Sequence, residues 1–198
     1  MPKRTLHDEF FKRAKQEGYR SRAAYKLKQI QDSKGLIKAG DRVLDLGCAP
    51  GAWLQVAAEL AGPSGCVVGV DLQPCKGAFE AQVAHRVGDA FETEPGELIT
   101  LAGGRFDVIL SDMAPKTSGV NDHERSVALC QRVLEVAIGS LKPTGHLAMK
   151  VFEGGMYKDL LDSTATIFAQ VKGFKPKASR GVSREMYIVA KGYVPSPV

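Results

Sequence analysis

The stretch at residues 43–53, with the sequence VLDLGCAPGAW, constrains the fold more than any other part of the chain. Its apolar beginning is typical of a short buried strand, and Gly47, Pro50 and Gly51 then mark a turn that leads into a helical pattern. Glycines let a ligand approach the backbone closely, and ligands of open α/β sheets bind at the carboxyl ends of strands. The stretch therefore predicts a ligand-binding strand–turn–helix unit, although an ordinary tight turn has the same pattern.

The spacing of the glycines argues against a dinucleotide as the ligand. The dinucleotide fingerprint is Gly-x-Gly-x-x-Gly, whereas the glycines here stand at positions 47 and 51 with Ala49 between them. Asp71 ends the next apolar run, where α/β folds place an acid that accepts hydrogen bonds from ribose hydroxyls. Asp89 follows a third run and offers a carboxylate to an exocyclic amine. These turns favour a nucleoside without a phosphate.

Short strand-like runs alternate with helical stretches along the chain. We expect helices near residues 6–17, 21–32, 52–58 and 124–141, and strands near residues 43–46, 66–71, 82–87, 106–110, 145–151, 168–174 and 185–190. Such alternation predicts a mostly parallel sheet with right-handed crossovers. We interpret residues 1–198 as a single doubly wound α/β domain, with residues 1–42 as a basic helical extension packed on it.

The charges are distributed unevenly along the chain. Residues 1–42 hold twelve Lys or Arg against five acids, residues 43–171 hold nine against sixteen, and residues 172–198 hold six against one. An acidic middle between two basic ends predicts a catalytic body with a surface that binds a polyanion, provided that the ends meet in the fold. A solvated charged face is the alternative interpretation of either basic segment.

The composition gives no indication of a membrane, a metal or a disulfide. No apolar run approaches the roughly 20 residues of a membrane-spanning helix, and the first residues have no apolar signal core, so we expect a cytoplasmic location. The cysteines at positions 48, 66, 75 and 130 lack the spacing of a zinc site. We expect four reduced thiols and no bound metal.

Four charged residues stand at the ends of predicted elements. Asp112 follows the fourth strand, Lys150 lies near the end of an apolar strand, and Glu185 opens the last strand. Lys26 belongs to the second helix, which Ser21 is expected to cap, and it would lie off the apolar stripe of that helix. A lysine within an apolar strand is costly unless it is paired or useful. Each of the four residues also fits an ordinary ion pair.

Several of these stretches together match a known family. They are SRAAYKL at residues 21–27, DLGCAPGAW at 45–53, SDMAP at 111–115, MKVFEG at 149–154 and SREMYIV at 183–189. In this order the chain resembles the RrmJ/FtsJ family of S-adenosylmethionine-dependent ribose 2′-O-methyltransferases over nearly its whole length. The resemblance implies a Rossmann-like α/β methyltransferase domain with about seven strands in a mostly parallel sheet and helices on both faces.

The resemblance also implies roles for individual residues. The catalytic tetrad of the family corresponds to Lys26, Asp112, Lys150 and Glu185. The residues implied in binding S-adenosylmethionine are Gly47, Pro50, Gly51, Trp53, Asp71, Asp89 and Asp112. The implied substrate is a uridine ribose in large-subunit ribosomal RNA, with the protein acting as a monomer. A tRNA or another RNA is the alternative substrate.

The tetrad predicts how one proton is handled. A ribose hydroxyl is a poor nucleophile, so we assign Lys150 as the base that removes its proton, which requires a neutral amine. A second cation, Lys26, favours the neutral form, while Asp112 opposes it and orients the amine, and Glu185 positions Lys26 or the ribose. Two other classes remain open, a non-catalytic RNA-binding assembly factor and a nucleotide-dependent oxidoreductase.

Overall fold

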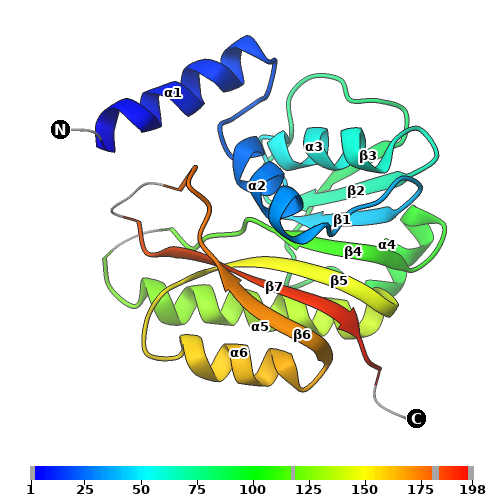
Figure 1. The fold of residues 1–198 in the computed structure, drawn as a ribbon. Helices are drawn as coiled ribbons and strands as arrows, with labels where there is room; N and C mark the ends of the chain where they lie inside the picture. The colour runs from blue at the N-terminus through cyan, green and yellow to red at the C-terminus, as the bar shows by residue number, and fades with distance from the viewer. Residues whose placement is uncertain (1–2, 117–118, 180–182, 196–198) are drawn as a thin grey trace.

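The computed structural model describes residues 3–116, 119–179 and 183–195, and within them a seven-stranded sheet forms the centre of the molecule (Figure 1). The strand order is β3-β2-β1-β4-β5-β7-β6, and β7 runs antiparallel to both of its neighbours while the other strands are parallel. The strands are β1 Arg42–Leu46, β2 Cys66–Asp71, β3 Val83–Val87, β4 Phe106–Ser111, β5 Leu141–Phe152, β6 Phe168–Phe174 and β7 Glu185–Tyr193. The predicted mostly parallel sheet is confirmed.

Six helices accompany the sheet in the described part of the chain: α1 Lys3–Gln16, α2 Ala24–Lys34, α3 Ala52–Ala61, α4 Pro95–Ala102, α5 Asp122–Ser140 and α6 Tyr157–Ala165. The sequence analysis missed α4 and α6, which have only eight and nine residues. Helices of this length show few repeats of an apolar period, and packing rather than propensity stabilises them. A proline at the start of α4 and Gly103 after its end were the available signals.

The chain reverses direction across the sheet between β1 and β4. From β1 it proceeds outward through β2 to β3, and it then returns to β4 on the other side of β1. In an open α/β sheet this reversal leaves a crevice outside the carboxyl ends of the strands. The turn after β1, which the sequence analysis identified first, therefore opens into that crevice.

Two apolar layers, one on each face of the sheet, form the core. On one face α4, α5 and α6 contribute Leu98, Val133 and Leu160. On the other face α2 and α3 contribute Ile30 and Leu54, and Figure 1 shows these helices on the side of the sheet opposite to α5 and α6. The prediction of helices on both faces is confirmed.

The second helix differs from its prediction in two respects. It begins at Ala24, and Ser21 is not its N-cap, because the Ser21 hydroxyl accepts a hydrogen bond from the Ala23 N–H within a preceding turn. Lys26 was expected off the apolar stripe, but it is buried with 6% of its surface exposed. Trp53 of α3 holds this segment in place, since its indole N–H donates to the Ala23 carbonyl at 2.8 Å.

The basic N-terminal segment contacts the loop between β6 and β7. Ala14 of α1, Tyr25 of α2 and Ala178 of the loop form a small apolar cluster, and the Ala178 N–H donates to Gln29 Oε1 at 3.2 Å. The two basic ends of the chain therefore meet in the fold. Residues 180–182 of the basic C-terminal segment lie outside the described residues. The division into a single domain with a packed extension stays a prediction.

Helix α4 offers a direct test of which face carries the core. Leu98 is fully buried, whereas Leu101 in the next turn is 45% exposed. We expect Leu98→Ala to lower the free energy of unfolding by about 2–5 kcal/mol, because it removes buried atoms and leaves a cavity. The control Leu101→Ala should change it by less than about 0.5 kcal/mol. Urea unfolding of both variants measures the difference, and equal losses would contradict the assigned face.

Candidate active site

Four elements bring the predicted tetrad to one place at the rim of the sheet. Asp112 directly follows β4, and Lys150 lies near the carboxyl end of β5. Because β7 is antiparallel to β5, its first residue, Glu185, pairs with Phe152 and so lies at the same rim. Lys26 reaches the rim from α2. The four residues stand far apart in the sequence, and the sheet order places them together.

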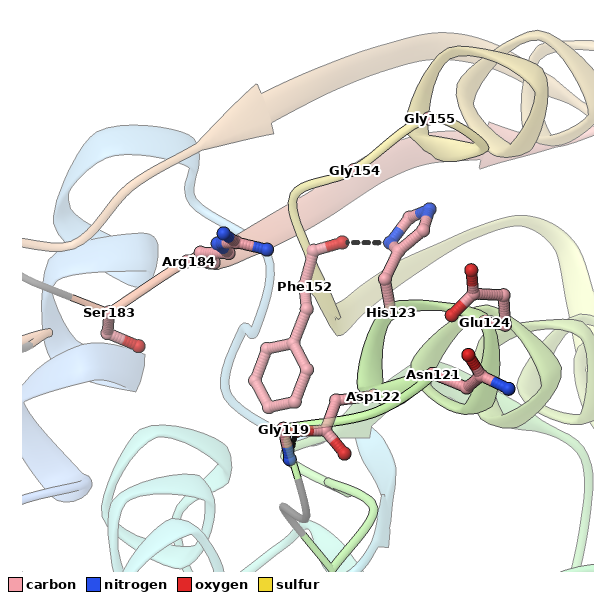
Figure 2. Close-up of a pocket in the computed structure, with 10 residues that line it drawn as sticks. All are labelled: Gly119, Asn121, Asp122, His123, Glu124, Phe152, Gly154, Gly155, Ser183 and Arg184. Carbon is pink, nitrogen blue, oxygen red and sulfur yellow. Dashed lines mark hydrogen bonds between the residues drawn. The ribbon is translucent and has the colours of Figure 1, made fainter.

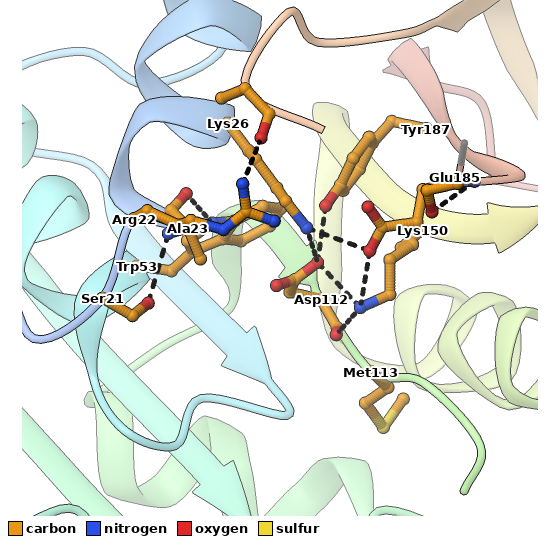
Figure 3. Close-up of polar contacts among 12 residues, drawn as sticks. Ser21, Arg22, Ala23, Lys26, Trp53, Asp112, Met113, Lys150, Glu185 and Tyr187 are labelled. Atoms are coloured by element: carbon orange, nitrogen blue, oxygen red, sulfur yellow. Dashed lines mark hydrogen bonds and ion pairs between the residues drawn. The ribbon is translucent and has the colours of Figure 1, made fainter. Parts of the chain in front are cut away.

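The four side chains form a compact cluster of alternating charge (Figure 3). Lys26 Nζ lies 3.0 Å from Glu185 Oε1 and 4.0 Å from Asp112 Oδ1. Lys150 Nζ lies 3.0 Å from Asp112 Oδ1 and 4.0 Å from Glu185 Oε1, and it also donates to the Asp112 backbone carbonyl. Each ammonium group therefore faces both carboxylates, and the full charges of the four groups sum to zero.

Burial makes this cluster electrostatically strong. The Lys26 and Lys150 side chains are 8% and 6% exposed, so solvent screens the ion pairs only weakly. Burial alone raises the pKa of Asp112, but the two lysines and the hydrogen bond from Tyr187 outweigh that effect and lower the pKa below its usual value. Asp112 is therefore ionised at neutral pH.

Tyr187 is a member of the site that the sequence analysis missed. Its hydroxyl donates to Asp112 Oδ1 at 2.5 Å, and Lys26 Nζ lies 6.0 Å from the centre of its ring. The ring also packs on Trp53, with 5.7 Å between centroids. Burial, followed by the Asp112 charge, raises the pKa of Tyr187 well above its usual value, so the phenol keeps its proton. Its position two residues after Glu185 was the available signal, because alternate residues of a strand share a face.

A cavity of ≈ 360 Å³ lies beside the cluster, in the crevice where the chain reverses direction. Asp112 lines it and thus belongs to both the cavity and the tetrad. Three other residues predicted to bind the cofactor, Gly47, Asp71 and Asp89, also line the cavity. Apolar residues complete the wall, among them Leu72, Phe91 and Met113. A volume of this size is suited to a small organic ligand.

The lining fits an adenosyl group. Gly47 has a φ of +80°, and a Cβ there would lie 2.5 Å from Met113 Cγ, so the wall needs glycine at this point. Asp71 accepts backbone hydrogen bonds from Ala49 and Gln73, at 3.0 and 2.8 Å, which fixes the carboxylate at the cavity wall. Each carboxylate oxygen can accept more than one bond, so Asp71 retains capacity for ribose hydroxyls.

The remaining residues predicted to bind the cofactor do not line this cavity. Trp53 is buried beneath α2, and Pro50 accepts a hydrogen bond from the Arg20 guanidinium through its carbonyl. Gly51 has a φ of +106°, and a Cβ there would lie 2.5 Å from the Phe79 ring. The three residues shape the turn between β1 and α3. A direct contact between them and the cofactor stays a prediction.

Asp45 is a buried acid to which the sequence analysis gave no role. It lies in the middle of β1, is fully buried, and neither carboxyl oxygen has a hydrogen-bond partner within residues 3–116, 119–179 and 183–195. Burial first, and then the charges of Asp112 and Asp71, raise the pKa of Asp45 well above its usual value. An isolated buried acid of this kind remains protonated in preference to ionising.

The described residues include neither a metal-binding cluster nor a membrane-spanning helix. No group of three or more His, Cys, Asp or Glu side chains is placed to hold a metal ion in this part of the chain. No described helix is both long and apolar enough to cross a bilayer.

Comparisons with known proteins agree with the fold. The model of the FtsJ-like methyltransferase family matches residues 19–193. A protein of Syntrophobacter fumaroxidans named ribosomal RNA large subunit methyltransferase E is 46% identical over 93% of this chain and 95% of its own length. A protein of the same name from Methanobrevibacter smithii is 45% identical over 96% and 91%. The crystal structure described as a ribosomal RNA methyltransferase from Plasmodium falciparum superposes with a TM-score of 0.79, at 26% identity, covering 90% of this chain and all of that one.

The sheet order, the cavity at the reversal point and these matches define a methyltransferase of the Rossmann-like class. Within that class, the chain belongs to the FtsJ-like methyltransferase family. The resemblance noted from the sequence motifs is confirmed.

Asp45 leads to a test by pH. Because its folded-state pKa is raised, the folded protein retains a proton that the unfolded chain releases above about pH 4, so this residue lowers stability as pH rises. At most, the free energy of unfolding falls by about 1.4 kcal/mol per pH unit because of this one group. We expect Asp45→Asn to flatten the decline of the unfolding free energy between pH 5 and 7, as measured by urea unfolding.

Asp162→Asn is the matched control, because Asp162 is an exposed acid on α6 that pairs with Lys158. It should leave the slope of the unfolding free energy with pH unchanged. An Asp45→Asn variant that is equally destabilised at pH 5 and pH 7 would show that Asp45 does not titrate differently in the folded and unfolded states.

Proposed function

We propose that this protein transfers a methyl group from S-adenosylmethionine to the 2′-hydroxyl of a uridine ribose in large-subunit ribosomal RNA. One observation carries the proposal. Asp112 lines the cavity that fits an adenosyl group and also contacts Lys150, so a methyl donor and a proton acceptor would meet across a single residue. The names of the relatives support ribosomal RNA as the substrate.

The cavity would hold the donor by its nucleoside. Asp71 and Asp89 would accept hydrogen bonds from the ribose hydroxyls and from the base, and Leu72 and Phe91 would flank the ring system. When bound, S-adenosylmethionine supplies a methyl group that its sulfonium already activates. Residues of this chain must then align the RNA hydroxyl and remove its proton.

In this proposal Lys150 removes the proton. Its Nζ is held from two sides, by the Asp112 carboxylate and by the Asp112 backbone carbonyl, so the amine has a fixed position. A neutral Lys150 leaves one cation, Lys26, between two carboxylates. Accepting the hydroxyl proton at Lys150 Nζ restores the charge balance of the cluster, which favours the transfer.

The groups around Lys150 position it and do not exchange the proton. Tyr187 donates to Asp112 Oδ1, the same oxygen that Lys150 contacts, and so restricts the rotation of that carboxylate. Glu185 holds Lys26 at 3.0 Å, which keeps this cation beside the cluster while Lys150 is neutral. Preorganised groups of this kind need no rearrangement during the reaction.

The RNA would approach from the side on which the two basic ends meet. Lys12 and Lys15 of α1 are exposed, as are Lys175 and Lys177 of the loop that packs against α1 and α2. Such a surface attracts the phosphates of a polyanion. We further propose that the protein acts on RNA as a monomer in the cytoplasm.

Other basic residues of the N-terminal segment are bound within the protein. Arg20 donates to the carbonyls of Pro50 and Ala78 and stacks on Phe79, with 3.6 Å to the ring centre. Lys28 lies 3.7 Å from Glu59 and above the ring of Tyr19. Substituting these residues would disturb the turn after β1 and the packing of α2, so they are poor probes of RNA binding.

Substitution of Lys150 tests the proposed reaction. We expect Lys150→Ala to lower methyl transfer by about 10²–10⁴-fold, because the proton acceptor is lost. Lys150→Arg should fail nearly as badly, since a guanidinium stays protonated and cannot accept the proton. Transfer of a labelled methyl group to large ribosomal subunits from cells that lack this protein measures the effect.

Cofactor binding provides the matched control for this test. Both Lys150 variants should bind S-adenosylhomocysteine like the unaltered protein in a calorimetric titration, whereas Asp71→Ala should bind it weakly. Near-normal turnover of Lys150→Arg at neutral pH would exclude Lys150 as the base. Absence of S-adenosylmethionine binding, or of ribose methylation in any RNA, would contradict the proposed function as a whole.

The RNA-binding surface can be tested with salt. We expect the double variant Lys15→Gln and Lys177→Gln to bind large-subunit RNA more weakly and to reduce the slope of log affinity against log salt by about 1.5. The control double variant Lys142→Gln and Lys158→Gln removes the same charge at the far end of β5 and on α6. Equal effects of the two double variants would mean that only total charge matters.

A further inference from the structure

A second cavity, of ≈ 620 Å³, opens at the rim on the other side of the tetrad. Figure 2 shows the residues that line it. The first cavity, which fits an adenosyl group, lies at the ends of β2, β1 and β4. Lys150 lies on β5, the next strand of the sheet. The second cavity lies at the ends of β5 and β7. The tetrad therefore stands between two cavities. Only the first is needed to hold the methyl donor.

The walls of the second cavity are fixed by hydrogen bonds. His123 Nδ1 donates to the Phe152 carbonyl at 2.6 Å, and His123 Nε2 accepts from the Met156 N–H at 2.9 Å. A Cβ on Gly154 would collide with the His123 ring, so the loop after β5 lies directly on this imidazole. The Arg184 carbonyl accepts from the Glu153 N–H at 2.8 Å. The cavity is thus preformed.

The chemistry of the lining points to a planar, uncharged ligand with N–H donors. Phe152 offers an aromatic face, and Asp122 and Glu124 line the cavity with carboxylates that accept hydrogen bonds and repel anions. Arg184 is exposed at the edge, and its guanidinium has no hydrogen bond or ion pair with another described residue. Asp122 already accepts a hydrogen bond from the Gly119 N–H at 2.9 Å. A nucleobase stacked on Phe152 would donate an N–H to Glu124 and place its phosphate near Arg184.

We propose that this cavity binds the nucleobase of the nucleotide whose ribose is methylated, stacked on Phe152 and drawn out of the RNA stack. The inference rests on the proposed function, because it takes the ribose at Lys150 as its reference point. Enzymes that modify nucleotides commonly extrude the target in this way.

The register of β5 supports this placement. Lys150 and Phe152 are two residues apart in one strand, so their side chains project from the same face and lie about 6.5–7 Å apart along it. In a nucleotide the base is attached to the ribose carbon adjacent to the one that carries the 2′-hydroxyl. A hydroxyl at Lys150 therefore leaves its base within reach of Phe152.

Binding of mononucleotides tests the cavity without requiring RNA methylation. The probe is uridine 5′-monophosphate, added to the full chain saturated with S-adenosylhomocysteine so that the first cavity is blocked. We expect the ring-proton NMR signals of His123 to shift in a saturable way, because a stacked base lies beside this residue. The signals of His146, toward the opposite end of β5, should stay unchanged.

Variants of the lining give the decisive comparison. Phe152→Leu should weaken uridine monophosphate binding and raise the KM for RNA about tenfold, with little change in kcat, while Phe152→Tyr should retain both. Arg184→Gln should also raise the KM for RNA. The control Lys158→Gln removes the same charge from exposed α6 and should have no such effect.

The inference would be overturned by a His123 signal that does not respond to uridine monophosphate, or by a Phe152→Leu variant that binds the probe and methylates RNA normally. These results differ from a failure of the proposed function. If the unaltered protein methylates no RNA yet binds uridine monophosphate at His123 and loses it in Phe152→Leu, the cavity assignment stands and the reaction assignment fails.

Discussion

The ionised carboxylate of Asp112 is the group on which the rest of the site depends. Its Oδ1 atom contacts Lys150, receives the Tyr187 hydroxyl and lies 4.0 Å from Lys26, so one oxygen joins β4, β5, β7 and α2. Losing one partner of a buried ion pair costs about 3–5 kcal/mol, because the other charge is left without compensation. The cluster that is proposed to perform the chemistry therefore also links these four elements to one another. Stability and reactivity share one set of contacts.

Much of the fold followed from patterns in the sequence. Alternating apolar runs located all seven strands, and the glycine turn after β1 correctly identified the crevice, with Gly47, Asp71 and Asp89 on the cavity wall. These features are local, since they depend on the period of a strand and on the needs of one turn. The tetrad was different. No spacing rule connects Lys26 to Glu185, and only the resemblance to a family grouped them before the structure showed their distances.

What the sequence could not predict depends on contacts between distant segments. Tyr187 resembles an ordinary core residue of an apolar strand until β4 places Asp112 against its hydroxyl. Lys26 was expected off the apolar stripe of its helix, and its burial depends on β7 bringing Glu185 beside α2. Counting charges located a basic surface but did not separate exposed cations from Arg20, which is bound to two carbonyls and a ring. Pairing of this kind is set by tertiary structure, which a charge count does not contain.

The place of β7 in the sheet has a consequence for the timing of activity during synthesis. It is the last of the seven strands to be made, yet it lies between β5 and β6, and it alone connects β6 to the sheet. It also carries Glu185 and Tyr187. A growing chain that already contains every residue lining the first cavity, the last of which is Leu129, therefore still lacks two of the groups that surround Asp112. Under the proposed function, the residues that would hold the donor are therefore synthesised before the reactive cluster is complete, and a chain without β7 would lack two groups that fix Asp112.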